Sequence, residues 1–366
     1  MSMRETLNGI KDSAPAHSRL ERLIRFLDSS EIDALLVSTD SNRRYLSGFT
    51  GSAGSLVVSQ SNCVLITDGR YTAQAIQESP QCEVITHSGP ILEQVASTVV
   101  ELGIGRLGFD PSTMSVKDFA DLGDRVGERC TLIAAPGLVE KLRIIKDPLE
   151  IDCMRRAIKI ADQVHEMVAH ELEVGKSERQ LAMQIEQEFR ELGAEKPSFD
   201  VIVAAGRNSA MPPHRPGNSV VKDGEAVVVD FGVIGDGYCS DITRTYCAGA
   251  RTEQFDEVYG IVLEAEHVAL ETVSAGQSAR EVDRAAREII ESAGYGDFFQ
   301  HGVGHGVGME IHEAPRLAAS SNDKLEAGMV HSIEPGIYLP KWGGVRIEDL
   351  VLVQEGGMEI LTSAPK

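Results

Sequence analysis

The chain has 366 residues, of which 42% are hydrophobic and 25% charged, so it is long enough for about two globular domains with substantial cores. Its formal net charge is −21, from 35 basic and 56 acidic residues. A surface of this sign repels phosphate backbones and anionic lipids, which argues against nucleic acids and membrane surfaces as partners.

The amino-terminal stretch is charged rather than apolar, with Arg4, Glu5, Lys11 and Asp12, so no signal peptide is predicted. No uninterrupted apolar segment approaches the length of a membrane span. The six cysteines are scattered without a Cys-x-x-Cys pair, which favours reduced thiols over zinc-finger or thioredoxin chemistry. We therefore predict a cytoplasmic protein.

Residues 1–136 alternate between helical and strand patterns. Residues 20–27 have the spacing of an amphipathic helix, and short apolar runs predict strands over 34–38, 55–58, 64–67, 82–86, 106–109 and 131–134. The alternation is typical of an α/β domain, and nothing in it has the spacing of a catalytic cluster.

Residues 137–366 form the second predicted domain, and a repeat runs through it. A start signal at Asp147 and Pro148 opens a long helix to about residue 172. Shorter helices are predicted from Gly175 to Gly193 and from Gly276 to Gly294, with capping boxes formed by Ser177 with Gln180 and by Ser278 with Glu281. Each follows a longer helix (148–172 and about 253–274) and precedes strand-rich sequence. We expect an α+β domain of two pseudo-symmetric halves with a site between them.

The chain is organised around an acidic hairpin in the first half. Residues 227–232 and 240–245 are β-prone, and a two-residue loop at Gly235-Asp236 would place Asp230 directly opposite Asp241, with their Cβ atoms about 5 Å apart. Opposed carboxylates on a buried hairpin need compensation, and a pair of divalent cations provides it. A surface hairpin with two solvated aspartates is the simpler alternative, but the apolar flanks favour burial.

The second half has a matching pair of acidic residues. Glu334 and Glu348 are about equally distant from the loop at 340–343, so they too could face each other. Between the two hairpins, a run with glycine at alternate positions contains His301, His305 and His312. Four carboxylates and one neutral imidazole carry about four negative charges, which neutralises two divalent cations and suits a metal-activated hydroxide.

Five short motifs occur in a fixed order. They are Asp230 in Val-Asp-Phe-Gly, Asp241 in Ser-Asp-Ile-Thr-Arg-Thr, His305 in Gly-His-Gly-Val-Gly, Glu334 in Ile-Glu-Pro-Gly-Ile-Tyr and Glu348 in Arg-Ile-Glu-Asp. Together they closely resemble the pita-bread metallopeptidases, and among them the Xaa-Pro peptidases (prolidase and aminopeptidase P). Residues 42–52 and 68–71 are similar to the amino-terminal domain of that family, so the resemblance covers the whole chain.

The resemblance implies a role for each ligand. Asp230 would chelate one metal, His305 and Glu334 would bind the other, and Asp241 and Glu348 would bridge them. Glu334 would also move a proton to the leaving amine. Two metal ions are implied, manganese by family habit and carboxylate-rich ligation, with cobalt or zinc as substitutes.

The resemblance also implies residues that act on the substrate. His312 matches a histidine that stabilises the tetrahedral intermediate, His301 one near the substrate, and Arg346 an arginine beside the metals. Thr243 fits a partner that orients a carboxylate. His214 matches a substrate-contacting histidine, although an extra proline before it displaces it by one position.

These motifs predict a homodimeric enzyme that hydrolyses the bond between an amino-terminal residue and proline. A methionine aminopeptidase would use the same five ligands, but the large amino-terminal domain counts against it. A creatinase-like amidinohydrolase or a non-catalytic binding protein would have lost ligands that are intact here. The glycine run does not follow G-x-G-x-x-G, so nucleotide binding is disfavoured.

Overall fold

The computed structural model describes residues 15–366, and the charged residues from which no signal peptide was predicted lie outside this range. The chain divides into two compact units, Met1–Arg143 and Ile144–Lys366. The division lies later than the predicted boundary after residue 136, because the short helix α7 (Glu140–Arg143) packs within the first unit. There Nη1 of Arg143 donates a hydrogen bond of 2.6 Å to Oδ1 of Asn42.

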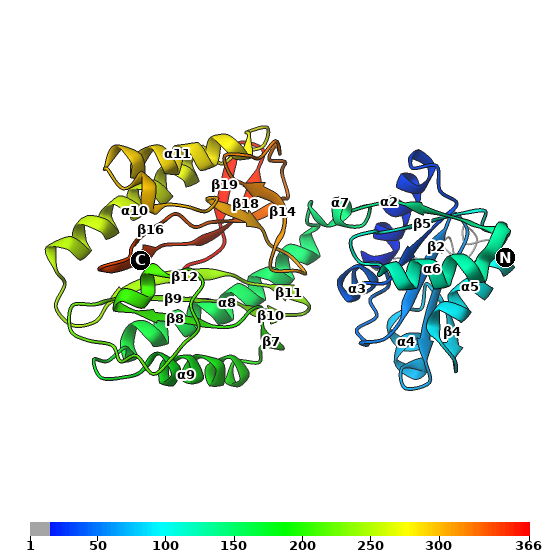
Figure 1. Ribbon diagram of the computed structural model, residues 1–366, viewed down its shortest axis with the longest axis horizontal. Helices are drawn as coiled ribbons and strands as arrows, with labels where there is room; N and C mark the ends of the chain where they lie inside the picture. The colour runs from blue at the N-terminus through cyan, green and yellow to red at the C-terminus, as the bar shows by residue number, and fades with distance from the viewer. Residues whose placement is uncertain (1–14) are drawn as a thin grey trace. The chain divides into compact units, whose positions relative to one another are not determined.

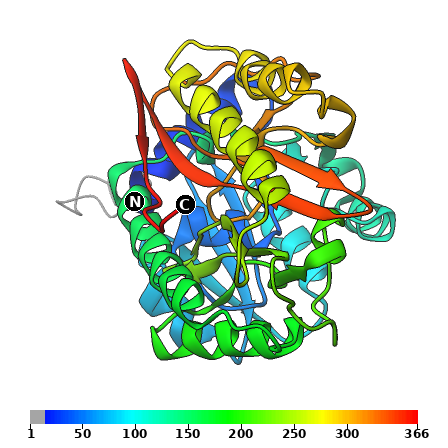
Figure 2. The same ribbon diagram turned by 90° about the vertical axis from the view of Figure 1, so that its left-hand side faces the viewer.

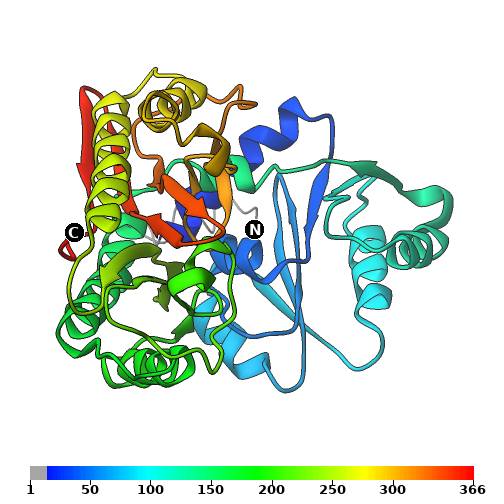
Figure 3. The same ribbon diagram turned by 60° about the vertical axis from the view of Figure 1, so that its left-hand side comes forward.

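The first unit is an α/β domain, as the sequence predicted. Its elements are α2 (Pro15–Ser29), β1 (Ala34–Val37), α3 (Asp40–Ser47), β2 (Ser55–Ser59), β3 (Cys63–Asp68), α4 (Thr72–Glu78), β4 (Glu83–His87), α5 (Ile91–Glu101), β5 (Arg106–Phe109), α6 (Val116–Val126), the 3-10 turn η1 (Gly127–Arg129), β6 (Thr131–Ala134) and α7. The strands form one six-stranded sheet in the order β4-β3-β2-β1-β5-β6, in which β2 runs antiparallel to its neighbours. Helices α5 and α6 pack together on one side of this sheet (Figure 3).

The second unit holds the repeated pattern. Its helices are α8 (Pro148–Glu171), α9 (Glu178–Glu191), α10 (Glu253–Thr272) and α11 (Ala279–Ser292), with 3-10 turns η2 (Gly206–Ala210) and η3 (Gly296–Phe298). Its strands are β7 (Lys196–Pro197), β8 (Ile202–Ala205), β9 (Ala226–Phe231), β10 (Val233–Gly235), β11 (Tyr238–Cys239), β12 (Ile242–Cys247), β13 (Gly304–Gly306), β14 (Glu313–Leu317), β15 (Val330–Ile333), β16 (Gly336–Leu339), β17 (Gly343–Arg346), β18 (Asp349–Gln354) and β19 (Gly357–Ile360).

The two halves of this unit repeat one arrangement. Helices α8 and α9 lie on one side of the strands and α10 and α11 on the other (Figure 1; Figure 2 gives the view turned by 90°). The strand order is β12-β9-β8 in the first half and β14-β13-β15-β18-β19 in the second, with β16 and β17 forming a separate ribbon. Matching bridges, Ser177 to Val220 and Ser278 to Lys324, lie at the start of the second helix of each half. The predicted α+β pseudo-symmetric architecture is therefore confirmed.

The helix starts follow the sequence signals with one exception. Asp147 and Glu150 form a complete capping box at α8, and Ser177 and Gln180 form one at α9. The box predicted at Ser278 is wrong, because the hydroxyl of Ser278 makes no capping bond at α11. The carboxylate of Glu281 pairs instead with Arg284, one turn further along the helix.

Each half has its own hydrophobic core. Val164, Leu181 and Phe231 belong to the first, and Val262, Val282 and Ile333 to the second. A smaller cluster that includes Met154, Val307 and Leu350 joins strands of the two halves. The cores include Phe231 and Ile333, the sequence neighbours of the predicted ligands Asp230 and Glu334. Within residues 15–366, no helix combines the length and apolar character that crossing a membrane requires.

Candidate metal centre

The acidic hairpin of the first half forms, but its register differs from the predicted one. Asp230 pairs with Thr243, not with Asp241. The two-residue loop is Asp236-Gly237, with φ of 52° and 83°, as a type I′ turn requires. The pairing is thus shifted by two positions. Because side chains alternate with a period of two, this shift places the two aspartates diagonally and keeps them on the same face.

The second half supplies two glutamates from its own ribbon. In the pairing of β16 with β17, Gly336 lies opposite Arg346, and continuing this register places Glu334 opposite Glu348 just beyond the paired residues. The backbone N–H of Glu348 donates to the carbonyl of Thr243 at 3.1 Å. This bond joins the two ribbons at the point where the carboxylates converge.

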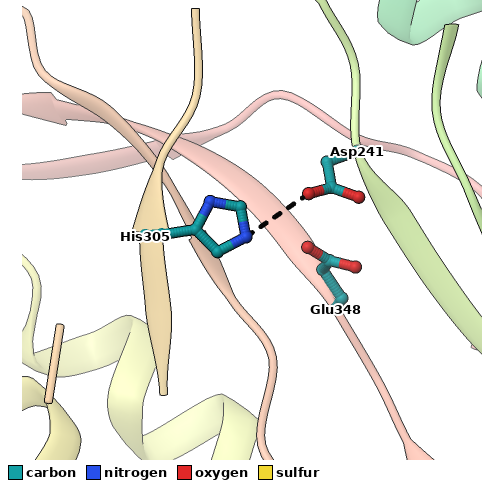
Figure 4. A group of neighbouring side chains, drawn as sticks. All are labelled: Asp241, His305 and Glu348. Atoms are coloured by element: carbon teal, nitrogen blue, oxygen red, sulfur yellow. Dashed lines mark ion pairs between the residues drawn. The ribbon is translucent and has the colours of Figure 1, made fainter. Parts of the chain in front are cut away.

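His305 enters from β13, between two glycines that allow close backbone packing. A Cβ at Gly304 would lie 2.0 Å from the carbonyl oxygen of Ser332. The ring Nδ1 of His305 lies 3.1 Å from the carbonyl oxygen of Gly306. The other ring nitrogen, Nε2, faces Oδ2 of Asp241 at 3.5 Å and Oε1 of Glu334 at 3.4 Å. One ligand atom each from Asp241, His305 and Glu348 lies within 4.8 Å of the other two (Figure 4).

Burial and mutual repulsion set the charge of this cluster. Burial, and then the charges of Glu348, Asp230 and Glu334, hold the pKa of Asp241 well above its ordinary value. Burial, and then Glu334 and Asp230, do the same to the pKa of Glu348. Burial raises the pKa of Glu334 to about 7 and lowers that of His305 to about 4.

The donor set fits divalent cations. Asp230 Oδ1 and Glu348 Oε1 are buried side-chain atoms without a hydrogen-bond partner, which normally costs about 1–3 kcal/mol each. Carboxylate oxygens and a neutral imidazole are suitable ligands, and cations among them would remove both the repulsion and the missing partners.

Arg346 connects the carboxylates of the two halves. Its guanidinium forms an ion pair with Asp230. Its Nε donates to the hydroxyl of Thr243 at 3.1 Å, and that hydroxyl donates to Glu348 at 2.7 Å. Nη1 donates to the hydroxyl of Tyr338 at 3.0 Å. Thr243 therefore orients a glutamate of the opposite half.

A cavity of about 410 Å³ opens over the cluster. It is lined by Phe199, Ile202, Pro212, Pro213, Asp230, Asp241, His301, His305, Ile311, His312, Glu334, Arg346 and Glu348. The structure thus brings together eight of the predicted site residues. The apolar members were missed from the sequence, although Ile202 pairs with Asp230 across β8 and β9 and so shares its face.

Two further histidines face this cavity. The ring of His312 lies 4.4 Å from that of His305, measured between centroids. His301 has Nε2 2.9 Å from the hydroxyl of Tyr338, and burial, followed by the charge of Arg346, lowers its pKa to about 4. Tyr338 was not singled out from the sequence, yet it lies four positions after Glu334 in the same ribbon.

His214 lies elsewhere. Its Nε2 is 3.0 Å from Oε2 of Glu178, and it is not among the residues that line the cavity. The two prolines before it, Pro212 and Pro213, line the cavity instead. The sequence expectation that His214 contacts substrate therefore has no support in its position.

Ion pairs of Asp349, the residue after Glu348, stabilise the start of β18. Asp349 pairs with Arg244 at 2.8 Å and with Lys366 at 2.6 Å. Nη2 of Arg244 also donates to the carbonyl of Ala364 at 2.7 Å. Asp349 thus points away from the carboxylate cluster, because neighbouring side chains on extended backbone face opposite sides.

Similar proteins share both units. Residues 152–355 match Metallopeptidase family M24, and residues 19–145 match the Creatinase/Prolidase N-terminal domain. An Xaa-Pro dipeptidase of Pyrococcus furiosus is 38% identical over 355 residues, covering 95% of this chain and 98% of that protein.

Solved structures agree with this assignment. The Xaa-Pro dipeptidase from Bacillus anthracis is 41% identical, with a TM-score of 0.93 over 96% of this chain and 98% of its own. The X-Pro aminopeptidase from Thermotoga maritima is 36% identical, with a TM-score of 0.88 over 95% of this chain and 98% of its own. The chain therefore belongs to metallopeptidase family M24, with a creatinase/prolidase-type amino-terminal domain.

Proposed function

We propose that this enzyme hydrolyses the peptide bond between an amino-terminal residue and proline, with two divalent cations as cofactors. The observation that carries the proposal is the convergence of three buried carboxylates, the half-buried carboxylate of Glu334 and a neutral histidine on one cavity with an apolar wall. Relatives whose names specify Xaa-Pro dipeptidase or X-Pro aminopeptidase activity support the substrate class.

Five side chains would hold the two cations: Asp230, Asp241, His305, Glu334 and Glu348. Bound cations supply Lewis-acid polarisation of a carbonyl oxygen and a lowered pKa for water. Manganese is the proposed ion from the carboxylate-rich donor set, with cobalt and zinc as substitutes.

Glu334 is the proposed proton carrier. Its carboxylate lines the cavity, with Oε1 3.4 Å from Nε2 of His305, and would there accept a proton and pass it to the leaving amine. His312, which lines the cavity, would donate a hydrogen bond to the substrate carbonyl or carboxylate. His301, whose ring nitrogens contact the carbonyl of Gly302 and the hydroxyl of Tyr338, would border the substrate. Arg346 would hold Asp230 and Glu348 in place through its ion pair and through Thr243.

The proline ring of the substrate would occupy the apolar side of the cavity. Phe199, Ile202, Ile311 and the two prolines at 212 and 213 offer a surface without charge. Such a wall favours a compact apolar ring and provides no partner for a charged side chain.

The proposal includes a cytoplasmic homodimer. The six cysteines all lie within residues 15–366 and form no disulfide there, which supports a reducing compartment. Dimerisation rests on the family resemblance, and light scattering of the purified enzyme tests it.

A substrate panel with a matched pair of variants tests the proposed activity. Manganese-loaded enzyme should hydrolyse Gly-Pro or a longer Xaa-Pro-Xaa peptide much faster than Met-Ala, and the two proline substrates separate dipeptidase from aminopeptidase. Asp241→Asn should lower the rate more than roughly 100-fold and reduce bound metal. Asp236→Asn is the control, because Asp236 lies at the exposed tip of the same hairpin, paired with Arg156. Preferential cleavage of Met-Ala, or equal effects of the two substitutions, would refute the proposal.

A further inference from the structure

Glu178 is a buried carboxylate with four hydrogen-bond donors, all from one loop. It is the first residue of α9, and its side chain is fully buried. Oε1 accepts from the backbone of Ala205 at 2.9 Å and from Nδ2 of Asn208 at 2.7 Å. Oε2 accepts from the backbone of Gly217 at 2.9 Å and lies 3.0 Å from Nε2 of His214.

These contacts hold the carboxylate as an anion. Burial alone would raise the pKa of Glu178, but the hydrogen bonds outweigh burial and the pKa lies below its ordinary value. The first turn of α9 adds the favourable end of the helix dipole. A buried carboxylate whose two oxygens each have two hydrogen-bond contacts is a rigid anchor. The loss of any one donor would leave a buried oxygen without that hydrogen bond, which is energetically costly.

The loop anchored in this way forms one wall of the cavity. The loop comprises residues 205–217. It begins at Ala205, the last residue of β8, and at Gly217 it contacts Glu178 at the start of α9; Pro212 and Pro213 lie between these two points. Neither proline has a backbone N–H with which to fix its position. On one side of the pair, the backbone of Met211 donates to Asn208 at 3.0 Å, and on the other side His214 reaches Glu178.

We propose that Glu178 and His214 are positioning residues for substrate specificity: they hold the Pro212–Pro213 wall against which the proline ring of the substrate packs. The inference rests on the proposed function and adds a structural origin for proline selectivity. It also reassigns His214, which acts through the wall and not on the reacting bond.

The position of the wall should affect binding more than chemistry. Dispersion contacts with an apolar ring weaken steeply when a wall recedes by a fraction of an ångström. The four carboxylates and His305 lie on other segments, namely the two ribbons and β13. The second ribbon meets the loop at Ser209, which accepts from the backbone of Gly344 at 2.7 Å, whereas His214, on the other side of the two prolines, contacts Glu178 of α9.

Steady-state kinetics of histidine variants test the inference. His214→Ala should raise KM for an Xaa-Pro substrate roughly tenfold with kcat nearly unchanged, and should raise KM less for the matching Xaa-Ala peptide. His214→Gln should restore part of the loss, because its amide can still donate to Glu178. His267→Ala is the control, since His267 is exposed on α10, paired with Glu271.

Three results would overturn the inference. A fall in kcat of about 100-fold at constant KM, without rescue by glutamine, would place His214 at the reacting bond. Unchanged KM and selectivity in His214→Ala would show that the wall does not depend on the anchor. Wild-type enzyme without Xaa-Pro activity would remove the proposed function and the inference with it. Glu178→Gln should resemble His214→Ala, and the histidine variants decide the matter if Glu178→Gln does not fold.

Discussion

His165 shows how burial fixes the charge of a single side chain next to the metal centre. Its fully buried ring stacks on Phe231, with centroids 4.1 Å apart and an interplanar angle of 15°. Nδ1 lies 2.9 Å from the hydroxyl of Tyr246, and Nε2 lies 3.2 Å from the carbonyl of Ile242. Burial, followed by the positive charge of Arg244, lowers the pKa of His165 to about 3.

His165 should therefore make the protein less stable in acid. Below its ordinary pKa of 6.5 the unfolded chain binds a proton that the folded state does not, so stability is lost as pH falls from about 6.5 towards 3. At pH 5 the loss amounts to about 2 kcal/mol. Urea unfolding between pH 7.5 and pH 5, with chelator present, should give a smaller loss for His165→Gln than for wild type. An equal loss of unfolding free energy between pH 7.5 and pH 5 in wild type and His165→Gln would contradict this account.

Single-residue expectations differed in how far the sequence could support them. Asp230 lies on β9, and Asp241, Glu334 and Glu348 each lie directly next to the end of a strand. The alternation of faces along extended backbone therefore carries a side chain's direction from one position to the next. His214 lies in a proline-rich loop, which has no such periodicity. Its direction depends on Glu178, more than thirty residues earlier in the chain, and that contact cannot be inferred from the local sequence.

At the scale of the element, the first hairpin shows why register was harder to predict than strand identity. The sequence Gly-Asp-Gly allows a two-residue turn at either of two positions. Long-range contacts favour the observed one: the backbone of Gly237 donates to Glu195 at 3.0 Å, and Arg156 pairs with Asp236 at 2.6 Å. Neither partner is visible from the hairpin's own residues. The error was two positions, so the predicted face, and with it the metal site, was retained.

The same hairpin offers a test of how tightly its strands pack. A Cβ at Gly232 would lie 1.8 Å from the carbonyl oxygen of Ser240, whereas one at Gly235 would meet nothing closer than 3.4 Å. Gly232→Ala should therefore push the segment before Asp241 away and destabilise the protein by about 2–3 kcal/mol. Gly235→Ala should change stability little. Chemical unfolding and metal content measure both effects, and equal stability of the two variants would refute the packing argument.

At the scale of the molecule, the proposed metal ligands come from both halves of the second unit, and Asp230 and Glu348 are more than one hundred residues apart in the sequence. The pseudo-symmetric architecture was predictable because glycines and helix starts repeat at a fixed offset along the sequence. The division between the units was harder to predict from the sequence, because α7 belongs to the first unit through contacts such as that of Arg143 with Asn42.

Metal binding should therefore stabilise the second unit selectively. A cation that binds only the folded state at 100 times its Kd adds about 2.7 kcal/mol to stability. Hydrogen exchange followed by mass spectrometry should show that manganese slows exchange in peptides from β9, β12 and β17, compared with chelator-treated protein. Peptides from β1 to β6 serve as the internal reference and should not change. Uniform slowing in both units, or slowing that persists in Asp241→Asn, would argue against cations at this centre.

The charge network behind Glu348 has a practical consequence for handling the protein. Lys366 reaches Asp349, and the carbonyl of Ala364 accepts from Arg244, so residues 364–366 support the segment that carries the proposed ligand Glu348. An affinity tag joined rigidly after Lys366 would compete with that support. A flexible spacer before such a tag, or a fusion at the opposite end of the chain, leaves the anchoring contacts intact.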